Sequence, residues 1–176
     1  MEQSPFKELF GVTSLQTLQF FFDGLREVVS ESVRKEDFFY PASILAHYAQ
    51  VSCASTNGFS CPRTLIDVYE NFVSPGNPAL TRSKLDLGIC EIAGGQCLFL
   101  SGFFERELQS RHNIRWYIYN GRRFYTLVAE NTVERERGAK MQKMADQFEI
   151  WHGAYSSLRR HLRESQYILN LPTSES

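Results

Sequence analysis

A carboxylate and a histidine are the first residues whose types suggest chemistry. Glu91 lies in the middle of 85–104, a segment whose apolar side chains would surround a helix on every side. An ionised carboxylate inside such a helix needs a partner, because an unpaired charge in the interior is too costly. We expect His47 as that partner, with Tyr48 and Arg115 as alternatives, beside a cavity for a small ligand. We favour a purely structural explanation over this ligand site, namely a bond from Glu91 to a backbone group or exposure of Glu91 to water.

A second pair has the spacing of a metal-binding motif. Glu149 and His152 stand three residues apart, which places a carboxylate and an imidazole on one helix face. Di-iron bundles use two such Glu-x-x-His motifs with two further glutamates, and this chain has only one. A metal site would therefore need Glu91 and His47 as additional ligands. The alternative is a partly exposed helix flank beside Trp151, so the identity of any cofactor stays unknown.

A third group combines arginine with aromatic side chains. Its members are Arg111, Arg115, Tyr119, Arg122 and Arg123. Such a combination can bind nucleic acid or a phosphorylated ligand by stacking and charge. Acidic residues at 105, 107 and 130 dilute the group, and the net charge of the chain is −1. These charges favour a solvated helix face over a nucleic-acid interface.

The common catalytic signatures are absent from the sequence. It contains no Walker loop, G-x-G-x-x-G, G-x-S-x-G, H-E-x-x-H or C-x-x-C motif. The four cysteines are best explained as free thiols in a reducing compartment. The N-terminus has no signal-peptide pattern, and 85–104 contains too many polar residues to span a membrane, so we expect a soluble cytoplasmic protein.

Apolar periodicity predicts helices throughout the chain. The expected helices cover about 13–33, 41–54, 62–73, 85–109, 114–130 and 131–162. Within 85–104, three glycines share one helical line with Glu91, which would let a neighbouring backbone approach. The segment 114–130 also suits a β-hairpin turning at Asn120 and Gly121, but its spacing and the lack of partner strands favour a helix.

The strongest periodic signal lies near the C-terminus. Seven apolar residues keep a spacing of three and four: Met141, Met144, Phe148, Trp151, Tyr155, Leu158 and Leu162. A stripe of this length needs a long partner helix. That partner is either the helix at 13–33 of the same chain or the same helix of a second subunit.

One part of the chain resembles a known pattern. The residues concerned are Gly102-Phe103-Phe104, Arg111, and the aromatic run 117–125 of the form Tyr-x-x-x-Gly-x-x-x-Tyr. This arrangement is similar to that of a family of uncharacterised bacterial proteins. The resemblance implies an all-helical bacterial protein and no particular activity.

These observations predict an all-α, single-domain bundle over 1–176. It would have about six or seven helices, a buried central helix at 85–104 and a frayed tail from 172. We expect a non-enzymatic cytoplasmic interaction or regulatory protein that forms a homodimer and has no membrane association. The alternatives are a ligand-binding or metal-dependent bundle with its site near Glu91, and a nucleic-acid-binding protein.

Overall fold

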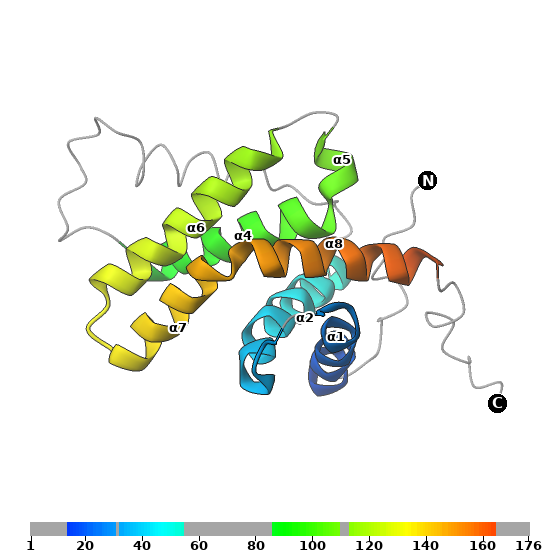
Figure 1. Ribbon diagram of the computed structural model, residues 1–176, viewed down its shortest axis with the longest axis horizontal. Helices are drawn as coiled ribbons and strands as arrows, with labels where there is room; N and C mark the ends of the chain where they lie inside the picture. Colours follow the sequence, from blue (N-terminus) through cyan, green and yellow to red (C-terminus); the bar gives the residue numbers. More distant parts are fainter. Residues whose placement is uncertain (1–13, 31, 55–85, 110–112, 165–176) are drawn as a thin grey trace. The chain divides into compact units, whose positions relative to one another are not determined.

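The chain folds into helices. The computed structural model describes residues 14–30, 32–54, 86–109 and 113–164 (Figure 1). In these ranges there are seven α-helices and one short 3-10 helix, and no strand. The prediction of an all-α bundle is confirmed. The helix predicted at 62–73 and the tail predicted from 172 lie outside the described residues.

Two compact units make up the chain. The helices are α1 (Ser14–Val28), η2 (Lys35–Phe38), α2 (Phe39–Ala54), α4 (Leu87–Phe103), α5 (Glu105–Gln109), α6 (Ile114–Asn131), α7 (Arg135–Asp146) and α8 (Phe148–Glu164). Of the described residues, those up to 54 and those from 154 to 164 form the first unit, and those from 86 to 153 form the second unit. Helix α8 therefore contributes residues to both units. The expectation of a single domain stays a prediction.

Helix α4 is the predicted buried helix. It begins after Asp86, whose Oδ1 accepts hydrogen bonds from the backbone N–H groups of Gly88 (2.9 Å) and Ile89 (3.2 Å). Every residue from 97 to 103 is buried. Burial on all sides is wrong for the N-terminal turns, because Ile92 is 61% exposed.

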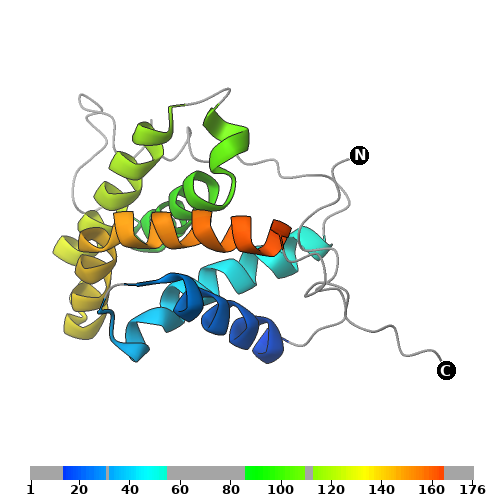
Figure 2. The ribbon, with the colours of Figure 1, turned by 45° about the vertical axis from the view of Figure 1, so that its right-hand side comes forward.

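Helix α4 packs on α6 through small residues in the second unit (Figures 1 and 2). A Cβ added at Gly94 would lie 3.1 Å from the ring of Tyr125. A Cβ added at Gly121 would lie 2.9 Å from the Cβ of Cys97 and would overlap the ring of Phe148. The two helices can approach this closely only because both positions lack a side chain. Neither Gly94 nor Gly121 belongs to the predicted line of glycines.

The segment 114–130 is helical, as predicted, and not a hairpin. Asn113 caps α6 by accepting a hydrogen bond from the N–H of Arg115 (3.0 Å). Asn120 and Gly121 form no turn but lie buried within the helix. There the Nδ2 of Asn120 donates to the carbonyl of Trp116 (2.8 Å). The absent Cβ of Gly121 serves packing instead of turn formation.

The C-terminal apolar stripe is buried within a single chain. All seven of its residues, Met141, Met144, Phe148, Trp151, Tyr155, Leu158 and Leu162, are at most 6% exposed. The stripe spans two helices and not the single helix that we predicted, because the backbone departs from helical geometry at Gln147. Hydrogen bonds from Gln147 N to Lys143 O and from Trp151 N to Gln147 O continue across this break and preserve the register. The stripe thus does not require a second subunit.

In the first unit, α1 packs on α2 and η2. Helix α1 ends at Val28, earlier than the predicted end near 33. Because the helix ends there, the chain can turn back and bring Phe38 against Phe22, with ring centroids 6.1 Å apart. Pro41 lies in the first turn of α2, as predicted. Its carbonyl accepts a 2.6 Å hydrogen bond from the hydroxyl of Tyr155, which is fully buried.

Replacing Gly121 by alanine tests the α4–α6 contact. We expect Gly121→Ala to lower the free energy of unfolding by about 1–3 kcal/mol, because the added Cβ meets Cys97 and Phe148. Gly153→Ala is the matched control, since an added Cβ there meets nothing within 4 Å. Alanine is the better helix former, so Gly153→Ala should raise the free energy of unfolding by about 0.5–1 kcal/mol. Urea unfolding measures both, and equal effects of the two substitutions would contradict the packing argument.

Alkaline pH tests the buried Tyr155. Burial raises the pKa of Tyr155 well above its ordinary value of 10, and the nearby phenols of Tyr40 and Tyr48 raise it further. Above pH 10 the unfolded chain releases this proton and the folded chain keeps it, so stability falls with rising pH by about 1.4 kcal/mol per pH unit. Urea unfolding should show that Tyr155→Phe lacks this part of the decline. At pH 7, Tyr155→Phe should lower the free energy of unfolding by about 1 kcal/mol, because it removes the hydrogen bond to Pro41. An equal fall of stability with rising pH in the unsubstituted protein and in Tyr155→Phe would contradict this prediction.

Candidate functional site

Glu91 forms an ion pair, as its position in α4 requires, but with a residue that we did not predict. Both Nε (3.2 Å) and Nη2 (2.7 Å) of Arg137 in α7 donate to the Oε2 of Glu91. The two side chains are 26% and 31% exposed, so the pair lies at the edge of the second unit's interior. The arginine neutralises the carboxylate and links α4 to α7.

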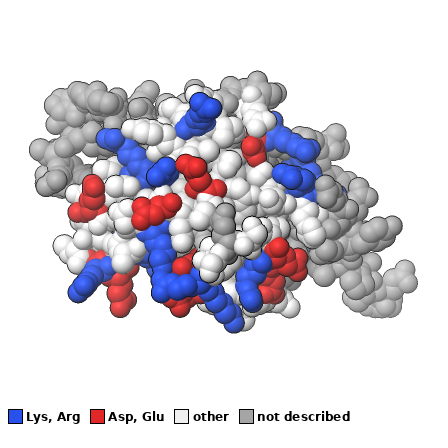
Figure 3. Space-filling model, in the orientation of Figure 1, with Lys and Arg blue, Asp and Glu red and all other residues white. Residues whose placement is uncertain are grey.

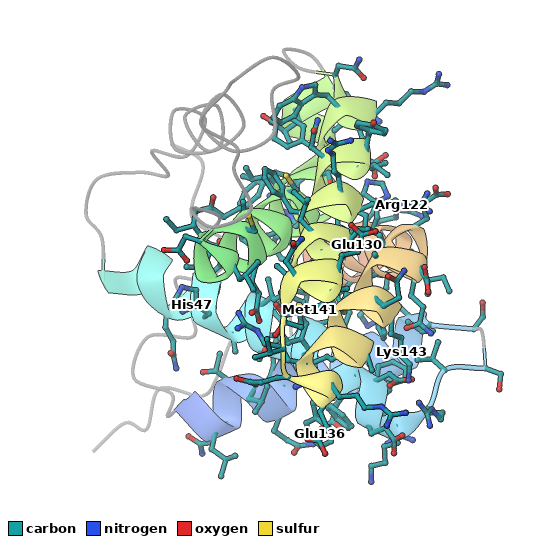
Figure 4. The ribbon with its side chains drawn as sticks, turned by 90° about the vertical axis from the view of Figure 1, so that its left-hand side faces the viewer. His47, Arg122, Glu130, Glu136, Met141 and Lys143 are labelled. Atoms are coloured by element: carbon teal, nitrogen blue, oxygen red, sulfur yellow. The ribbon has the colours of Figure 1, made fainter. Side chains whose placement is uncertain are left out.

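The predicted position of His47 is wrong. We expected His47 on the apolar side of its helix, but it is exposed and projects from α2 (Figure 4). The buried stripe of α2 passes instead through Ala42, Leu45 and Ala49. The ring of His47 packs edge-on against Tyr48, with centroids 5.2 Å apart. The partner observed for Glu91 within the second unit is therefore an arginine. Pairing of Glu91 with His47 or Tyr48, which belong to the first unit, stays a prediction.

The Glu-x-x-His pair does not converge on a common point. The Oε1 of Glu149 faces the Nη1 of Arg122 (3.3 Å), whereas the Nε2 of His152 lies 3.1 Å from the carbonyl oxygen of Ser101. A carbonyl oxygen only accepts hydrogen bonds, so Nε2 is the donor in this contact. Among the described residues, no three His, Cys, Asp or Glu side chains form a group that could hold a metal ion.

Cys90 of α4 is not poised for nucleophilic chemistry. Cys90 and Cys97 are both buried. Burial raises the pKa of Cys90 to about 11, and the negative charge of Asp86 adds to the rise. Cys90 is consequently protonated at neutral pH, when only the thiolate would react.

Four of the predicted basic and aromatic residues share one exposed face of α6. Arg115, Tyr119, Arg122 and Arg123 follow the spacing of neighbouring turns, and all four side chains are exposed. We call these four residues the α6 basic face. Arg111, the fifth predicted member, lies outside the described residues. Tyr119 is the most unusual of the four, because a large aromatic side chain is 63% exposed there.

Charges of both signs are mixed over the molecular surface. Figure 3 shows blue and red side chains interspersed on the face it presents. On α6 itself no acidic residue occurs before Glu130. The α6 basic face is therefore a local cationic feature on a chain whose net charge is −1.

Arg137 is the functional residue that the sequence reasoning missed. It lies four residues before Met141 and so continues the apolar stripe by one helical turn. An arginine in that position borders the buried face of α7, next to whatever polar group lies opposite. The extended stripe could have identified Arg137 as a half-buried cation in need of an acidic partner, but not Glu91 as that partner.

Comparisons with known proteins yielded no match. No family model, no curated protein and no solved structure is similar to this chain. The resemblance to a bacterial family accordingly stays a prediction. In the part of the chain that the structure describes, no helix combines the length and apolar character needed to cross a membrane.

A double-mutant cycle on Glu91 and Arg137 tests the half-buried ion pair. With Glu91→Gln and Arg137→Gln, we expect a coupling energy of about 1–2 kcal/mol, because partial burial limits screening by solvent. Arg122 and Glu149 provide a matched control with 48% and 71% exposed side chains, and their coupling should be about 0.5 kcal/mol or less. Thermal or urea unfolding gives both values. Similar couplings in the two cycles would refute the distinction.

Proposed function

We propose that this protein is a non-enzymatic interaction protein of the cytoplasm that binds another protein through the α6 basic face. One observation supports the proposal: exposed Tyr119 lies on the same helix face as Arg115, Arg122 and Arg123. Tyrosine and arginine are enriched among the residues that dominate binding energy at protein interfaces. Each combines a large apolar area with a polar end, which suits a surface that is wet when free and covered when bound.

A non-enzymatic role agrees with the state of the side chains that suggested chemistry. Glu91 is held by Arg137, Glu149 faces Arg122, and His152 donates to a backbone carbonyl. Each of these groups therefore has a protein partner that accounts for it. The proposal of a ligand-binding or metal-dependent bundle has less support than interaction through an exposed face.

Self-association is the second part of the proposal. The buried C-terminal stripe no longer supplies a reason for a dimer, so a homodimer would have to use another surface. The α6 basic face would not pair with itself, because two copies related by a two-fold axis would bring arginines together. A homodimer and a different partner on α6 are therefore compatible.

Photo-crosslinking tests the proposed surface. With a benzophenone amino acid in place of Tyr119, irradiation of cells should produce one discrete adduct, because the partner covers this position. The same substitution at Val133 is the matched control: Val133 is 99% exposed and belongs to the same unit, but lies beyond the end of α6. Absence of an adduct at position 119, or equal adducts at both positions, would overturn the proposal.

The mass of the products separates the two parts of the proposal. A partner on α6 should give an adduct whose mass differs from twice the 20.3 kDa of this chain. Sedimentation velocity of the purified protein at tens of micromolar then tests the homodimer by itself. A strict monomer in that experiment would remove self-association and leave the α6 proposal standing.

A further inference from the structure

The α6 basic face has the chemistry of a carboxylate-binding surface. Its arginines lie within about two and a half helical turns, with no acidic residue of α6 between them. Among the described residues, the guanidinium groups of Arg115 and Arg123 have no ion-pair partner. Arginine presents a planar fork of N–H donors that matches a carboxylate. An acidic partner would therefore meet donors that already lie on one face of the helix.

One arginine of this face already holds a carboxylate of the same chain. The Nη1 of Arg122 donates to the Oε1 of Glu149 at 3.3 Å, and both side chains are largely exposed (Figure 4 labels Arg122). An exposed pair of this kind contributes little to stability and opens readily. Arg122 thus already binds a carboxylate, and a carboxylate of another protein can displace Glu149 from it.

We propose that the α6 basic face binds an acidic segment of a partner protein, and that Glu149 competes with that segment for Arg122. This inference rests on the proposed function. The spacing of the arginines defines the ligand: Arg115 and Arg122 are seven residues apart, or about 10 Å along the helix. The partner segment has two carboxylates at that separation, as two acids seven residues apart on a helix would, with an apolar side chain between them to cover Tyr119.

The distribution of charge favours a short acidic segment over nucleic acid. Glu130 is exposed at the end of α6 (Figure 4), and Glu134 and Glu136 are exposed just beyond it. These acids would repel a phosphate backbone that continued along the helix. The cationic surface is therefore limited to the length of the α6 basic face, which suits a pair of carboxylates better than a long polyanion.

Tryptophan fluorescence gives a direct measurement of binding. The chain has two tryptophans: Trp151 is fully buried, whereas Trp116 is partly exposed and lies two turns before Arg123 on the same line of α6. A ligand on the α6 basic face should therefore change the emission of Trp116. The probe is a 15-residue helical peptide with glutamates seven residues apart and a leucine midway, and the control peptide has glutamines in place of the glutamates.

Variants of the full chain test the two parts of the inference. The glutamate peptide should bind, and the glutamine peptide should bind at least tenfold more weakly. Arg122→Gln should weaken binding about tenfold, and Lys140→Gln, an equal charge change at an exposed site of α7, should have little effect. Glu149→Gln should tighten binding about two- to fivefold, because it removes the competing carboxylate. Such a gain cannot result from misfolding.

Each contrary result has a defined meaning. Equal binding of the two peptides, or tighter binding of a 15-nucleotide single-stranded DNA, would overturn the assignment to an acidic protein segment. Unchanged or weaker peptide binding by Glu149→Gln would overturn the competition. If neither peptide binds while the benzophenone at position 119 still gives its adduct, the acidic ligand is wrong and the proposed function survives.

Discussion

The close contact of glycine with aromatic rings between α4 and α6 determines how the second unit is built. Gly94 faces the ring of Tyr125, and Gly121 faces Phe148 at the start of α8. Because neither glycine has a Cβ, two backbones and two large rings fit where ordinary side chains would collide. This contact fixes which side of α6 points inward. The opposite side, with Tyr119 and its arginines, must then face solvent.

Much of the fold follows from local patterns in the sequence. The spacing of apolar residues identifies the helices, and even the ambiguous segment 114–130 is helical as its period indicates. The break at Gln147 was not predictable in this way, since hydrogen bonds continue through it and the stripe keeps its register. The same continuity made two helices resemble one long coiled-coil segment. We considered a second subunit because a single helix of that length would need an equally long partner helix.

The sequence predicts that Glu91 is paired, but it does not predict which residue pairs with Glu91. A carboxylate within a largely apolar helix must be paired, and Glu91 is. Which residue pairs with it depends on which helices become neighbours, and one sequence read along its length does not reveal that. The position of His47 was predicted wrongly, because four-residue spacing alone did not show which stripe of α2 is buried. The α6 basic face was easier to predict, because a single helix positions all four described members.

The division of the chain into two units has a consequence during synthesis. The second unit is continuous in sequence, whereas the first joins its N-terminal helices to the part of α8 from residue 154 onward. About 90 residues separate these parts, which a ribosome takes roughly 5–20 s to translate. During that interval the aromatic side chains of α1 and α2 lack Tyr155, with its hydrogen bond to Pro41. The packing of the N-terminal helices is therefore completed only after the C-terminal part of α8 has been synthesised.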